Sequence, residues 1–468
     1  MKPVSTRPPR RLVNLSALYT PPVAVGHRWE RLLGLAGLWI LLTSQLHAAD
    51  SNRLTLVSPH PQEVKAEFGE GFQRWHEARY GTKVTMDWRD LGGSSEIQRF
   101  VESEFRAKTN GIGIDIFFGG GPEPFLALAD KQWLQPWPGG QKALLGIPAK
   151  AAATDVYDEE FRWFGAALSS FGILQNNRVQ KQLGLPHVER WEDLAHTNCF
   201  RWVGAGDPRS SGSMNNMYEA FLQAFGWNRG WHLLTEIAGN VRQFDRISTT
   251  TAKDTSLGQV AYSFAIDYFA FIQIAAVGKN HLEFTLPKDF TAISPDGIAI
   301  LKGAPHTQTA ERFLEFVLGE TGQQLWFLPR GHPDGPHRFS IERLSIRPEF
   351  YDRYRGVSPI EINPFQLQQT YRYDSRLARK RRDIVRSLFG SILIDVHPEL
   401  QKAWGTMIAR GIPATDRDDF GMPPITEQEA LQLAANDAWI KNAEYRTRTK
   451  LQWQVNALKK YRRLAQSR

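Results

Sequence analysis

The chain has 468 residues, enough for two or three domains with substantial cores, and its 42% hydrophobic and 12% aromatic content is that of a globular protein. The net charge is +8, but residues 50–369 hold 32 Lys/Arg and 37 Asp/Glu, so the positive excess lies at the two ends. This distribution argues against nucleic-acid binding by the main fold.

Residues 1–49 have the pattern of a secretory signal peptide with a long n-region. An apolar run at 32–42 follows Arg28 and Arg31 and precedes Ala48 and Ala49. The run is too short for a membrane span, which needs about 20 apolar residues. We therefore expect export and cleavage near Asp50. The only cysteine, Cys199, lies in a predicted buried strand and excludes a disulfide framework or a cysteine-cluster metal site.

Three strand–loop–helix units open the mature chain, with predicted strands at 54–57, 84–88 and 114–118. Small-residue loops follow each strand, at 58–60, 91–95 and 119–121. Consecutive units of this kind predict a parallel sheet with helices on its faces. Ligands of such sheets bind beyond the carboxyl ends of the strands, where all three loops fall.

A fourth loop, at 207–213, follows the predicted strand at 199–203 and opens a helix whose inner face carries Met214, Met217 and Phe221. Its serines are good helix caps, and its glycine lets a ligand approach the backbone closely. Free N–H groups, hydroxyls and the positive end of a helix dipole together predict an anion cradle. An ordinary capped turn is the alternative, but the three earlier loops of similar chemistry favour a ligand site.

Two further segments complete the pattern. An extended run at 162–175 contains Ser169, Ser170 and Phe171, and a predicted strand at 260–265 leads into Asp267 and Tyr268. Phe171 and Tyr268 are candidates to line a cleft. Residues 345–468 form polar helical patterns with basic runs, which indicate a helical appendage with solvated faces, or a surface for a partner or anionic lipid.

These segments, in this order and spacing, resemble the periplasmic solute-binding component of ABC importers, in the group that includes ferric-iron-binding proteins. The resemblance covers about residues 51–345 and implies an α/β fold of type II-like design, with two lobes, a cleft between them and crossing strands near 163–175 and 261–286. It places lobe 1 at 50–165 and 280–345, lobe 2 at 166–279 and a helical C-terminal extension at 346–468. It also implies a periplasmic monomer that works with an inner-membrane permease, without catalysis, cofactor or nucleic acid.

The predicted solute is a small organic anion such as a phosphorylated sugar or polyol. The candidate binding residues lie on the loops described above: Ser58, His60, Gly93, Ser94, Ser95, Gly120, Gly121, Ser169, Ser170, Asp207, Ser210, Ser211, Gly212, Ser213, Asp267 and Tyr268. No resident metal is expected among them.

Two alternatives stay open. The first is a ferric ion bound with an anion, through His60, Asp267 and Tyr268, although the ferric binders use two adjacent tyrosines where this chain has Asp267 and Tyr268. The second is a secreted enzyme or sensory module on the same fold. The chain has no Gly-x-Ser-x-Gly elbow, His-Glu-x-x-His or Walker A loop, which argues against the common hydrolases and nucleotidases.

Overall fold

The computed structural model describes residues 52–151, 154–367 and 373–466, and the predicted secretion signal lies outside these ranges. Strands β1 (Arg53–Val57), β2 (Thr85–Arg89) and β3 (Ile116–Phe118) pair in parallel, in the order β2-β1-β3. Helices α2 (Gln62–Tyr80), α3 (Ser94–Ala107) and α4 (Pro122–Asp130) follow the three strands in turn. The predicted strand–loop–helix units are therefore confirmed, and because the three strands are parallel, their loops lie at the same, carboxyl edge of the sheet.

Strand β7 (Phe164–Asn176) runs through both halves of the fold, and all 13 of its residues are buried. Its first half pairs with β12 (Ile293–Leu301) and packs in the core of lobe 1, while its second half pairs with β10 (Tyr262–Ile266) and β11 (Leu282–Thr285). The chain returns to the lobe 1 core only at Ile293, later than the expected second crossing at 261–286. The chain crosses back only after β11, because β11 first pairs with the second half of β7 on the lobe 2 side.

Lobe 1 is completed by short strands β4 (Leu134–Gln135), β5 (Lys150–Ala151) and β6 (Thr154–Asp155) and by helices α5 (Gly140–Ala143), α11 (Thr307–Leu318), α12 (Glu320–Phe327) and α13 (Glu349–Arg353). Lobe 2 contains strands β8 (Val203–Gly206) and β9 (Val241–Asp245), helices α6 (Asn177–Leu183), α7 (Gly212–Phe225), α8 (Trp227–Asn240), α9 (Ser248–Ser256) and α10 (Asp267–Val277), and turns η1 (Trp191–Ala195) and η2 (Thr197–Cys199). Cys199 thus lies in a 3-10 turn before β8, not in the strand predicted at 199–203.

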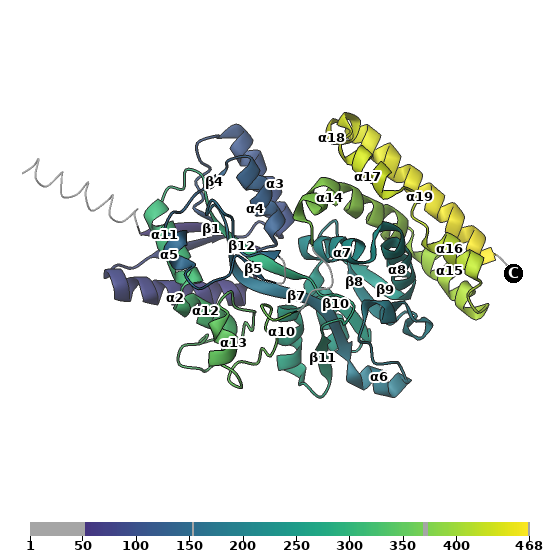
Figure 1. The fold of residues 1–468 in the computed structure, drawn as a ribbon, viewed down its shortest axis with the longest axis horizontal. Helices are drawn as coiled ribbons and strands as arrows, with labels where there is room; N and C mark the ends of the chain where they lie inside the picture. The colour runs from purple at the N-terminus through teal and green to yellow at the C-terminus, as the bar shows by residue number, and fades with distance from the viewer. Residues whose placement is uncertain (1–51, 152–153, 368–372, 467–468) are drawn as a thin grey trace, which may run out of the picture. The chain divides into compact units, whose positions relative to one another are not determined.

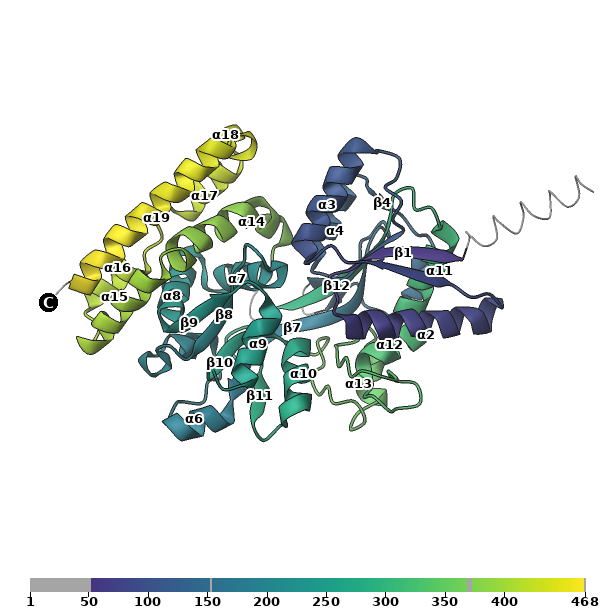
Figure 2. The same cartoon turned by 180° about the vertical axis from the view of Figure 1, so that it is seen from behind.

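The C-terminal extension consists of α14 (Ser375–Phe389), η3 (Gly390–Ile394), α15 (His397–Ala409), α16 (Ala414–Gly421), α17 (Glu427–Ala434), α18 (Asp437–Lys441) and α19 (Ala443–Gln466). Figures 1 and 2 show it against α7 and α8, coloured from green to yellow. Among the described residues, none of the helices is long and apolar enough to cross a bilayer.

The extension shares one hydrophobic core with lobe 2. Phe389 stacks on Tyr218 with ring centroids 4.2 Å apart, and Trp404 donates from Nε1 to Asn240 Oδ1 at 2.8 Å. Arg381 is 1% exposed and pairs with Glu219, which is 2% exposed. A buried ion pair of this kind survives only because each charge has its partner, so removal of either one is strongly destabilising. The helical appendage expected from the sequence is therefore structural, because it completes the hydrophobic core of lobe 2.

We expect Trp404→Ala to lower the free energy of unfolding by about 3–5 kcal/mol, because it opens a cavity where α15 meets α8. Urea unfolding followed by far-UV circular dichroism measures the loss. Leu451→Ala on α19 is the matched control: Leu451 is 53% exposed, and its truncation should cost less than about 0.5 kcal/mol. If Trp404→Ala loses as little unfolding free energy as the control, the extension is not part of the lobe 2 core.

Candidate functional site

A cleft of about 640 Å³ lies at the junction of the lobes, and side chains of both lobes line it. Eleven of the predicted binding residues line this cleft: His60, Gly93, Ser94, Gly120, Gly121, Ser169, Ser210, Ser211, Gly212, Ser213 and Tyr268. Phe171 also lines it, as its sequence position suggested, and Phe269 lies beside Tyr268. The four loops selected from sequence thus converge on one cavity.

The serine turn, residues 210–213, is held by local hydrogen bonds. The carbonyl of Asp207 accepts from the amides of Ser210 and Ser211 at 3.1 and 3.0 Å, and Ser211 caps α7 by accepting from the Met214 amide at 3.3 Å. Within the described chain, no acceptor is bonded to the amides of Gly212 and Ser213. Since the first-turn amides of a helix have no intrahelical acceptor, these two N–H groups remain available to a ligand.

The first turns of α3 and α7 approach each other across the cleft. A Cβ added to Gly212 would lie 2.9 Å from Ser94 Oγ, so the two helix starts lie close together and a side chain at position 212 would displace the Ser94 hydroxyl. The cap of α3 is Gly93, whose amide donates to Glu96 Oε2 at 2.8 Å. Two positive dipole ends, one from each lobe, face the same space.

The floor of the cleft is a buried polar network. Asp296 Oδ2 accepts from Arg343 Nη1 and His60 Nε2, each at 2.6 Å, while Asp296 Oδ1 accepts from the Gly120 amide at 2.6 Å. Arg343 Nη2 donates to Ser169 Oγ at 2.6 Å, and Ser58 Oγ lies 3.0 Å from His60 Nδ1. Every charge of the floor therefore has a partner within the protein.

These contacts shift the ionisation of the floor groups. Burial lowers the pKa of His60 and keeps the imidazole neutral, although Asp296 opposes this effect. Burial alone would raise the pKa of Asp296, but the Arg343 guanidinium and His60 outweigh it and hold the pKa well below its usual range. The floor therefore carries one compensated ion pair and a neutral histidine.

Asp267 and Tyr268 differ in their access to the cleft. Asp267 is 0% exposed and does not line the cavity; it accepts from the amide and hydroxyl of Ser170 at 2.7 and 2.9 Å and from the Tyr268 amide at 2.7 Å. The Tyr268 ring does line the cavity, with the Arg343 guanidinium 4.4 Å from its centroid. Burial raises the Tyr268 pKa above its usual range, so the phenol is protonated.

Five predicted residues do not line the cleft: Ser58, Ser95, Ser170, Asp207 and Asp267. Three of them instead form hydrogen bonds with a neighbouring side chain. Ser58 bonds His60, Ser170 bonds Asp267 at the start of α10, and Asp207 binds the side chain of Arg209. The sequence pattern identified the correct segments. It did not distinguish a side chain that lines the cleft from one that points into the fold.

Sequence reasoning missed several polar groups of the cavity: Lys65, Asn216, Arg246, Ser294, Asp296 and Arg343. Lys65 and Asn216 lie within amphipathic helices, one turn beyond the loops that were recognised. Arg343 is 2% exposed and follows Ile341 in an irregular segment that reaches the cleft through tertiary packing. A charged residue between Ile341 and Leu344, both buried, was the only local signal.

The extension contacts the serine turn and lobe 1. Arg209, next to Ser210, binds both carboxylate oxygens of Asp207 and both oxygens of Asp395 of the extension, the latter at 2.8 and 3.0 Å. Arg379 of α14 pairs with Asp130 at the end of α4. A further interlobe bond joins Asn216 Nδ2 to Glu123 Oε2 at 2.7 Å.

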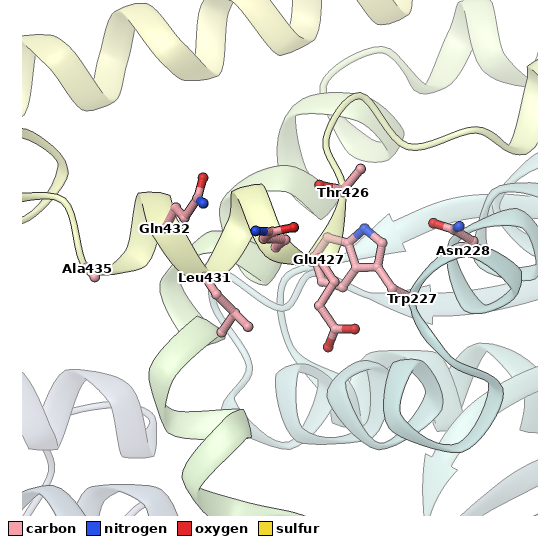
Figure 3. A pocket seen from close by; sticks show the side chains of 8 residues that line it. Trp227, Asn228, Thr426, Glu427, Leu431, Gln432 and Ala435 are labelled. Carbon is pink, nitrogen blue, oxygen red and sulfur yellow. The ribbon is translucent and has the colours of Figure 1, made fainter.

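A second hollow of about 880 Å³ opens on the outer face of lobe 2, between α17 and the start of α8 (Figure 3). Its lining residues are Trp227, Asn228, Thr426, Glu427, Gln428, Leu431, Gln432 and Ala435. Glu427, the one charged member of this lining, is already paired with Arg381. None of the four loops reaches this hollow, so the cleft between the lobes is the candidate site.

The buried Asp267 predicts a specific pH dependence. Burial raises its pKa to about 6, above the value of about 4 of an unfolded chain. The folded state therefore binds the proton more tightly, and its stabilising contribution is complete below about pH 4 and lost as the pH rises through 6. Relative to Asp267→Asn, the wild type should gain about 2 kcal/mol of unfolding free energy between pH 7.5 and 4.5. Urea unfolding at both pH values tests this, and a pH-independent difference would contradict it.

Comparison with known proteins finds a family match for part of the chain. Residues 114–332 match the family described as bacterial extracellular solute-binding protein. An uncharacterized protein of Haemophilus influenzae is 26% identical over 238 residues, which cover 48% of this chain and 63%, less than two thirds, of that relative. The phosphoglycerate transport regulatory protein PgtC of Salmonella typhimurium is 25% identical over 290 residues, covering 56% of this chain and 71% of PgtC.

The fold is shared with solved binding proteins. The apo ferric ion-binding protein A of Pasteurella haemolytica superposes with a TM-score of 0.55 and 16% identity, over 72% of this chain and 96% of that protein. A sequence identity of 16% supports a shared fold and nothing more. The predicted two-lobed α/β architecture with a helical C-terminal extension is confirmed by this shared fold, and residues 114–332 are similar to the bacterial extracellular solute-binding proteins.

Proposed function

We propose that the chain is the periplasmic solute-binding component of an ABC importer that captures a small organic anion, such as a phosphorylated sugar or polyol, and delivers it to an inner-membrane permease. The observation that carries the proposal is the approach of two helix starts, α3 from lobe 1 and α7 from lobe 2, across one cavity. Two positive dipole ends repel each other weakly, and an anion between them binds both. Anion binding would therefore stabilise the closed arrangement of the lobes.

The remaining walls suit the rest of such a solute. Ser169 and Ser294 offer hydroxyl groups, and Asn216 offers an amide. Phe171 and Phe269 add apolar faces on which the carbon skeleton of a sugar or polyol can pack. A polar wall beside an apolar one fits a solute with hydroxyl groups along a short carbon chain. The volume of the cleft, about 640 Å³, is in the range of small-molecule sites.

The relatives point in the same direction. One of them is named for phosphoglycerate transport, and phosphoglycerate is itself a small phosphorylated organic anion. A solved structure of the same fold is named for ferric-ion binding, so ferric ion is the alternative solute. Solute binding followed by release does not require catalysis, so the proposed role is transport without turnover, with the lobes closing about β7 and β12.

The geometry supports the anion more than the ferric ion. Both ring nitrogens of His60 already have partners, and the Asp267 carboxylate accepts three hydrogen bonds from groups of the protein itself. Among the residues that the structure describes, no group of three His, Cys, Asp or Glu side chains is placed to hold a metal ion. Tyr268 would have to lose both its proton and its contact with Arg343 before it could bind iron.

The serine turn provides the test. Calorimetry with 3-phosphoglycerate and fructose 6-phosphate should show each affinity falling by about 1–3 kcal/mol in Ser213→Ala, because one donor to a charged group is lost. Ser211→Ala should show a similar loss together with lower stability, since Ser211 also caps α7. Ser103→Ala, at an exposed position of α3, is the control and should change neither quantity.

Two results would contradict the proposal. Unchanged affinities in both serine variants would mean that the turn only caps α7. Binding of ferric ion by the wild type, with loss of that binding and of any tyrosinate-to-iron absorption in Tyr268→Phe, would establish the iron alternative.

A further inference from the structure

Lys65 is a buried cation without a counter-charge. It lies in the first turns of α2, is 4% exposed and lines the cleft. Within the described ranges, no carboxylate, carbonyl or hydroxyl oxygen is bonded to its ammonium group. Lysine is almost never this deeply buried unless it is paired. Lys65 therefore differs from the other buried cations of the fold, Arg343 and Arg381, which both bind carboxylates.

Three acidic groups that share the cleft or the helix with Lys65 are already occupied. Asp296 is bound by Arg343, His60 and the Gly120 amide, and Glu96 accepts from the Gly93 amide. Glu67, on the same helix, accepts from the amides of His337, Arg338 and Phe339. The nearby His60 is neutral and supplies no negative charge. Within the described residues, the Lys65 ammonium group thus has no ion-pair partner.

An unpaired ammonium group on a side chain that is only 4% exposed has lost part of its hydration, and an arriving anion offsets that loss. The cavity that Lys65 lines is the one where the starts of α3 and α7 converge. Neutral donors of helix starts accept any oxyanion, but an added full positive charge favours a ligand with more than one negative charge. A phosphate monoester carries between one and two negative charges near neutral pH.

We propose that Lys65 is the charge-selecting residue of the cleft, pairing from lobe 1 with the phosphoryl group of a hydroxylated phosphate monoester that the serine turn holds from lobe 2. This inference rests on the proposed function and deepens it, because it names the group that separates phosphate monoesters from neutral sugars. Arg246, an exposed cation of lobe 2 at the same cleft, adds positive potential at the mouth and favours the approach of such anions.

The test is Lys65→Met, which keeps the length and the apolar stem of the side chain and removes its charge. In the ligand-free protein the variant should melt about 2–4 °C higher than the wild type, because an unanswered buried charge is gone. Its affinity for fructose 6-phosphate should fall about 10–100-fold. Lys65→Arg, which keeps the charge, should retain most of the affinity. Lys380→Met, at an exposed position of α14, is the control and should change neither quantity.

The two readouts separate this inference from the function on which it rests. A lower melting temperature of ligand-free Lys65→Met, or an unchanged affinity for fructose 6-phosphate, would overturn the role of Lys65. Fructose is the neutral comparison, and an equal loss of affinity for fructose in the variant would also overturn charge selection. If the wild type binds neither fructose 6-phosphate nor 3-phosphoglycerate, the proposed function fails and the phosphoryl assignment falls with it, whatever the melting temperatures show.

Discussion

The architecture depends on one strand that belongs to two cores. All 13 residues of β7 are buried, and the strand pairs with β12 along its first half and with β10 and β11 along its second. Ser169 and Ser170 lie at the midpoint, where the strand leaves one core and enters the other. Because backbone groups in a strand must be paired when buried, both lobes are built outward from β7. The cleft therefore forms above the middle of this strand, with Ser169 on its floor.

The floor and the mouth of the cleft are built on different electrostatic principles. At the floor, Asp296 and Arg343 form an ion pair, so these buried charges are compensated before any solute binds. Around them, donors stay open at the starts of α3 and α7 and at Lys65. A compensated floor gives rigidity, since each of its groups has a fixed partner. Open donors give affinity, because their partners come with the ligand.

The extension is part of the hydrophobic core of lobe 2. Its helices contribute Phe389 and Trp404 to the lobe 2 core, and its Asp395 holds Arg209 beside the serine turn. Arg379 also reaches lobe 1 at Asp130. In the proposed function, a serine turn that is held in place by charged side chains loses less freedom on binding, which favours affinity. The extension is thus coupled to the site even though none of the residues that line the cleft belongs to it.

The sequence by itself determined the parallel units of lobe 1 and the four small-residue loops, because strand alternation, helix periodicity and capping are local properties that neighbouring residues encode. Nine of the eleven predicted lining residues followed from those loops. Only the tertiary structure decided that Asp267 turns inward to Ser170 and that Lys65 and Arg343 reach the cleft. It also decided that the basic C-terminal helices complete a core. Each of these outcomes depends on contacts between segments far apart in the chain, such as Arg343 with Ser169, and no local pattern of residues encodes such a pairing.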